Sequence, residues 1–128
     1  LININHCDTT ILKQIPGIGS YTAAKIIRYG ERLGGYHSID QLYEIKIDSA
    51  LVDKWFKIEA NPTVKTLDIN KTEFSELLRH PYLEYEEVKA IFNYKRKHGE
   101  LKNIKELLMI EPFDSIKVKR ISPYIRFS

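Results

Sequence analysis

A Pro-Gly-Ile-Gly turn near the start of the chain has the residue types that suit binding of an anion. Pro16 fixes φ and resists further helix, and glycine reaches backbone conformations that other residues adopt only at a cost, so Gly17 and Gly19 allow a tight turn. Ile18 is apolar and is expected to point inward and anchor the turn. Ser20 is a favourable N-cap for a helix that starts there. Bare backbone N–H groups and a partial positive charge at such a helix start attract phosphate.

The helix that follows, expected from Ser20 to Leu33, carries basic side chains along one face. Tyr21, Lys25, Arg28 and Arg32 stand at i, i+4, i+7 and i+11, which places them in a single stripe. A solvated helix face would also explain the stripe, but its position beside the glycine turn favours a phosphate track. The candidate phosphate-binding residues are Gly17, Ile18, Gly19, Ser20, Thr22, Lys25 and Arg28.

The turn and the residues around it resemble a known family. Pro-Gly-Ile-Gly followed by Ala23, Ile26, Gly34 and Leu42 resembles the helix-hairpin-helix motif, and the repeat of the bacterial ComEA-type competence proteins in particular. Asn3-Ile4-Asn5 ahead of the hairpin strengthens the resemblance. It implies binding of duplex DNA through backbone phosphate without sequence preference, in DNA uptake or repair, with no catalysis and no cofactor. The alternative is a protein-interaction or structural module whose hairpins no longer bind DNA.

The chain contains an internal repeat, because a shift of 65 places aligns ten identical residues without a gap. These residues in the first half are Ile4, Asn5, Leu12, Pro16, Ile26, Tyr29, Gly34, Ile39, Leu42 and Ile45. One extra residue enters after Ile110, so that Asp48 corresponds to Asp114. In the second hairpin, Tyr82 and Glu84 replace the two glycines. A carboxylate repels phosphate and a tyrosine blocks close approach of the backbone, so this hairpin is expected to be structural.

The expected fold is all-α, with two tandem helix-hairpin-helix repeats in residues 1–64 and 65–128. Each repeat is expected to contain four short helices, and the polar segment 60–63 to link the two. Asn5 and Asn70 are expected to cap the first helix of each repeat, with Cys7 and Ile11 on the inner face of the first one. Later helices are expected to start after Ser38 and at Asp48 or Ser49, and the long helix of the second repeat to run over 85–98.

The charge, cysteine and histidine content of the chain excludes several classes of protein. The 20 basic and 17 acidic residues give a net charge of only +3, so the chain is not a histone-like polycation. The single cysteine excludes an internal disulfide and a multi-cysteine metal site, and the four histidines lack metal-ligand spacing. There is no apolar run of membrane-spanning length. The cluster Lys95–His98 is fully explained by the macrodipole at a helix C-terminus, and non-specific attraction for nucleic acid is the alternative interpretation. A first residue other than Met suggests an excised fragment.

Overall fold

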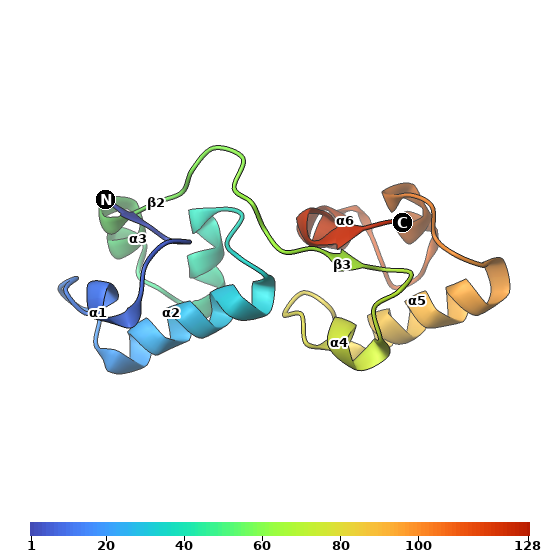
Figure 1. The fold of residues 1–128 in the computed structure, drawn as a ribbon, viewed down its shortest axis with the longest axis horizontal. Helices are drawn as coiled ribbons and strands as arrows, with labels where there is room; N and C mark the ends of the chain where they lie inside the picture. The colour runs from blue at the N-terminus through green and yellow to red at the C-terminus, as the bar shows by residue number, and fades with distance from the viewer. The chain divides into compact units, whose positions relative to one another are not determined.

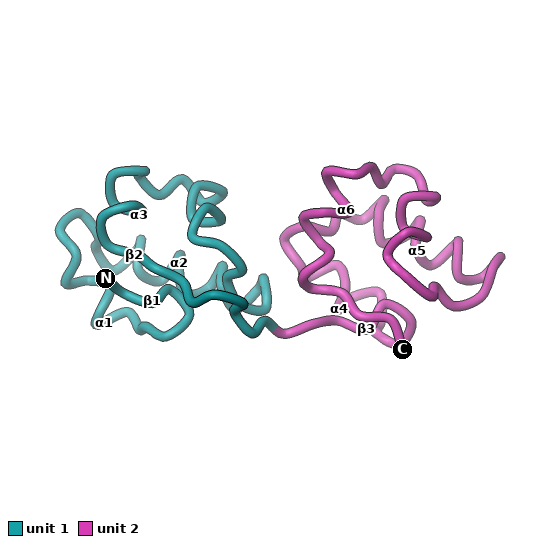
Figure 2. Tube along the Cα trace, turned by 90° about the horizontal axis from the view of Figure 1, so that it is seen from above, with its two compact units in different colours: residues 1–64 teal, residues 65–128 magenta.

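The computed structural model describes residues 1–128, which form two compact units, residues 1–64 and residues 65–128 (Figure 2). Helices dominate both units, and each strand is only two residues long. The predicted all-α fold class is therefore confirmed. None of the helices combines the length and the apolar character needed to cross a lipid bilayer.

The first unit is built around one long helix (Figure 1). In chain order its elements are β1 (Ile2–Asn3), α1 (Thr9–Leu12), α2 (Ser20–Leu33), the 3-10 helix η1 (Ile39–Ile45), α3 (Ser49–Trp55) and β2 (Phe56–Lys57). Strand β1 pairs in parallel with β2, with Ile2 opposite Phe56, so the two ends of the unit are tied together. Apolar side chains from every helix fill the core, among them Leu12, Ile15, Ile18, Ala23, Ile26, Leu33, Leu42 and Val52.

The second unit repeats this order of elements. It contains β3 (Leu67–Asp68), α4 (Phe74–Leu78), α5 (Tyr85–His98), η2 (Ile104–Met109), α6 (Ser115–Ile121), η3 (Ser122–Tyr124) and β4 (Ile125–Arg126), and β3 pairs in parallel with β4. Helices α2 and α5 both have 14 residues, and α3 and α6 both have seven. The predicted bounds of α2 and α5 are confirmed. The short parallel strands were not predicted.

Neither Asn5 nor Asn70 caps a helix, so that prediction is wrong. Asn5 instead clasps the backbone of Tyr36: Tyr36 N–H donates to Asn5 Oδ1 at 2.8 Å, and Asn5 Nδ2 donates to the Tyr36 carbonyl at 2.9 Å. Asn70 makes the same pair of bonds with Leu101, at 2.9 and 2.8 Å. A side-chain amide supplies a donor and an acceptor together, so one residue satisfies both polar groups of a distant backbone segment. The clasp fixes the chain where it leaves the long helix.

Helix α1 is shorter than expected, and its cap is Asp8, whose carboxylate accepts from Ile11 N–H at 2.9 Å. Cys7 therefore lies before the helix, with its thiol donating to the Ile4 carbonyl at 3.5 Å. Ile11 is exposed rather than inward, because a helix of a single turn presents only Leu12 to the core. The predicted cap Ser38 is confirmed and forms a full capping box, and α3 starts at Ser49, one of the two predicted starts, with Asp48 as its cap.

Candidate nucleic-acid interface

The first hairpin needs glycine at one position only. Gly17 has φ +95°, in the left-handed region that favours glycine. Gly19 has φ −99°, which any residue can adopt, and a Cβ added there would meet no atom within 4 Å. Gly19 rather than Ser20 is the N-cap of α2, so the predicted cap is displaced by one residue. Because the cap has no side chain, it makes no side-chain hydrogen bond to the start of the helix.

The start of α2 presents a group of backbone donors without internal acceptors. The first helical hydrogen bond runs from Ala23 N–H to the Gly19 carbonyl at 2.9 Å. The N–H groups of Gly19, Ser20, Tyr21 and Thr22 precede that bond, and they have no acceptor within the protein. The Gly17 N–H, in the turn before them, has none either. Aligned peptide dipoles add partial positive charge at the same place, so this end of α2 suits an anion.

Ile18 does not belong to this group of donors. Its N–H donates to the Ile15 carbonyl at 3.0 Å, and its side chain is only 4% exposed. The prediction that Ile18 anchors the turn is confirmed, whereas its expected contribution of a free amide is wrong. Ile18 is buried between two exposed glycines, so its side chain fixes the turn against the core.

The basic stripe lies along α2 from the same end. Arg28 is exposed and Lys25 is half-buried, and neither makes an ion pair within the protein. Lys25 Nζ lies 5.9 Å from the centre of the Tyr21 ring. Thr22 is half-buried and Ser20 is exposed, both in the first turn. The structure thus places the predicted side chains of Ser20, Thr22, Lys25 and Arg28 on the helix that begins with the free donors.

In the second hairpin two of the corresponding donors are occupied, and Tyr82 does not share the positive φ of Gly17. Tyr82 N–H, at the position of Gly17, donates to His80 Nδ1 at 3.1 Å. Glu84 N–H, at the position of Gly19, donates to Glu87 Oε1 at 2.8 Å. Glu87 is 3% exposed and pairs with Lys117 Nζ at 3.3 Å. An internal carboxylate therefore takes the place at this helix start that an external anion would need.

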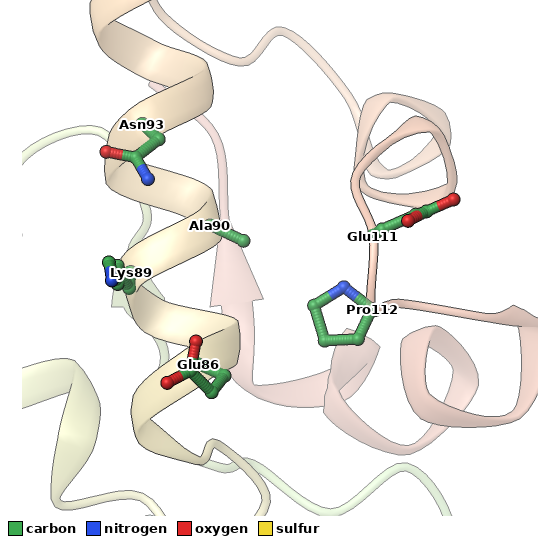
Figure 3. Close-up of a pocket in the computed structure, with 6 residues that line it drawn as sticks. All are labelled: Glu86, Lys89, Ala90, Asn93, Glu111 and Pro112. Carbon is green, nitrogen blue, oxygen red and sulfur yellow. The ribbon is translucent and has the colours of Figure 1, made fainter.

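A groove in the second unit shows how the two units differ in charge. Glu86, Lys89, Ala90 and Asn93 on α5 face the segment that carries Glu111 and Pro112 (Figure 3). The equivalent positions of α2, 65 residues earlier, hold Tyr21, Ala24, Lys25 and Arg28. Two of these four are basic, whereas the four residues on α5 include one carboxylate and one lysine.

Part of the basic charge of the second unit has a structural role. Lys95 Nζ donates to the carbonyls of Ile69 and Asn70 at 3.0 and 3.4 Å, and it lies 4.3 Å from the centre of the Phe92 ring. Burial lowers the pKa of Lys95. The cluster Lys95–His98 therefore does not act as one free basic surface, since its first member holds the start of the unit against α5.

Comparison with known proteins supports a helix-hairpin-helix motif in the first unit. Residues 1–52 match the family model described as the helix-hairpin-helix motif, which is associated with nucleic-acid binding in general. The chain is also similar to "Endonuclease/exonuclease/phosphatase family domain-containing protein 1" of Xenopus laevis, with 24% identity over an alignment that covers 95% of this chain. The chain spans about a quarter of the length of that relative. No solved structure matches the chain.

Proposed function

We propose that the first unit binds duplex DNA through its phosphate backbone, without preference for sequence. One observation carries the proposal: an uncapped helix start with free backbone N–H groups lies within a motif associated with nucleic-acid binding. Backbone phosphates are the same at every base pair, so contacts of this kind position a protein on DNA without selecting a sequence.

Specific residues have distinct roles in this proposal. The N–H groups of Gly17, Gly19 and Ser20 donate to phosphate oxygens, and the hydroxyls of Ser20 and Thr22 add donors beside them. Lys25 and Arg28 meet phosphates further along the same strand. Ile18 acts indirectly, by holding the turn in shape.

For the second unit we propose a repeat that has kept the fold and lost the phosphate site. Occupied donors at Tyr82 and Glu84, together with the carboxylates of Glu86 and Glu111, support this. A carboxylate near a phosphate repels it, so the groove of this unit disfavours a DNA backbone. The second unit then serves as a structural or protein-contacting part of the chain.

Within a longer protein, a module of this kind would hold other parts of that protein on DNA. The name of the Xenopus relative refers to an endonuclease/exonuclease/phosphatase family domain. We therefore favour a role in DNA processing, such as repair, over the DNA uptake implied by the ComEA-type resemblance. In this proposal the present residues bind DNA and the catalytic work belongs to another domain.

Fluorescence anisotropy tests the proposal by measuring how the whole chain binds labelled random-sequence duplexes over a range of salt concentrations. With about two to four phosphates neutralised, log K should fall against log salt with a slope of roughly −2 to −4. Several unrelated duplexes should give the same affinity. Strong dependence on sequence would contradict the proposal, and absence of binding at low salt would favour a protein-interaction module instead.

A further inference from the structure

Tyr21 is a large aromatic side chain that the protein leaves in solvent. It is 80% exposed, more than any other large apolar or aromatic residue of the chain. Its ring packs on no other ring and its hydroxyl has no partner within the protein. Tyr36 and Tyr94, by contrast, are buried or half-buried and donate to Ile26 and Glu106.

The exposure of Tyr21 is of interest because this residue lies at the start of α2. It is the second residue of α2, between Ser20 and Thr22, so its backbone belongs to the group of free donors. Isolated exposed apolar residues are common on protein surfaces and need no explanation. This one stands beside the proposed phosphate site, with the ammonium group of Lys25 5.9 Å from the ring centre.

A nucleotide held at this site would bring its base close to the ring. Sugar and base lie within a few ångströms of their own phosphate, and an exposed tyrosine reaches a similar distance from its own N–H group. Every base has a π-face, so stacking on an aromatic ring tolerates any sequence. In an intact duplex both faces of each base are covered by neighbours. Only an unpaired base, at a gap or a single-stranded end, offers a free face.

We propose that Tyr21 stacks on an unpaired base, and that interrupted duplex DNA is therefore the preferred substrate of the first unit. The inference rests on the proposed function, because phosphate at the start of α2 is what brings a base to the ring. It is specific to the first unit, since the equivalent residue of the second unit is Glu86. A carboxylate there neither stacks nor tolerates a neighbouring phosphate.

The test compares an intact duplex with the same duplex interrupted by a one-nucleotide gap opposite 2-aminopurine, a base whose fluorescence is quenched by stacking. The unaltered chain should bind the gapped duplex at least about fivefold more tightly, the lower end of the range for base–aromatic stacking, and should quench the 2-aminopurine. Tyr21→Ala should abolish both the preference and the quenching. Tyr21→Phe should retain the preference.

Tyr85→Ala provides a matched control, because Tyr85 is the exposed tyrosine at the start of α5, and its removal should change neither readout. Equal affinity of the unaltered chain for gapped and intact DNA would overturn the inference, as would an unchanged gap preference in Tyr21→Ala. An equal loss on both DNAs in Tyr21→Ala would also overturn it and would leave the proposed function standing. Failure of the unaltered chain to bind either DNA would instead refute the proposed function.

Discussion

Gly19→Glu is the most direct test of the phosphate site, because it gives the first hairpin the residue that the second hairpin has at the same position, Glu84. Gly19 has an ordinary φ, and a side chain there would meet open space, so the substitution should not strain the fold. A carboxylate at a helix start is favourable by about 0.3 to 1 kcal/mol. The melting temperature should therefore stay close to that of the unaltered chain. A loss of DNA affinity in this variant can therefore be distinguished from a loss of folding.

The effect on binding follows from Coulomb's law. A carboxylate about 6 Å from a phosphate charge, at an effective dielectric constant between about 20 and 80, costs roughly 0.7 to 3 kcal/mol. That corresponds to a loss of about 3- to 100-fold in DNA affinity. The new side chain would also reach the neighbouring N–H groups, as Glu87 reaches Glu84 N–H in the second unit. Both effects remove the site that phosphate needs.

Gly19→Ala is the matched control, since it adds a Cβ without charge. Anisotropy titrations on one random duplex at low salt, with thermal melting of each variant, compare the two. The alanine variant should bind within about twofold of the unaltered chain, and the glutamate variant should lose most of its affinity while folded. Glu84→Ala in the second hairpin should leave binding nearly unchanged. If folded Gly19→Glu binds like Gly19→Ala, phosphate does not approach this hairpin and the central assignment is wrong.

Three further predictions concern side chains. Lys25→Ala and Arg28→Ala should each weaken DNA binding to the same extent on every sequence and reduce the salt slope by about one. The melting temperature should change little, because exposed charges contribute little to stability. A large fall in stability at unchanged DNA affinity would show a structural role instead. Asn5→Ala should lower the free energy of unfolding by about 1 to 3 kcal/mol, because both hydrogen bonds to the Tyr36 backbone are lost. Urea titration measures this change. An unchanged urea midpoint would show that these two hydrogen bonds are dispensable for stability. Burial raises the pKa of the Cys7 thiol, so near neutral pH it should react more slowly with iodoacetamide than a free cysteine does, and denaturant should remove the difference.

The sequence by itself determined the elements whose signals are local. The apolar spacing of the long helices, with glycine after each, predicted Ser20–Leu33 and 85–98 as the structure has them. The caps at Ser38 and Asp48 were equally readable, since a capping side chain bonds only two or three residues along the chain. The Pro-Gly-Ile-Gly turn located the first hairpin, because a left-handed residue in a tight turn nearly always requires glycine.

Tertiary structure alone decided what the candidate site offers to a ligand. Asn5 reaches Tyr36 across 31 residues, and Glu87 meets Lys117 across a distance in sequence that no local pattern records. At Glu84 the N–H partner is Glu87, three residues along, and Glu87 is in turn paired with Lys117 from α6, whereas the N–H of Gly19 has no acceptor. Residue type marks where an anion could bind, but a site exists only where the folded chain brings no acceptor of its own to the same N–H groups.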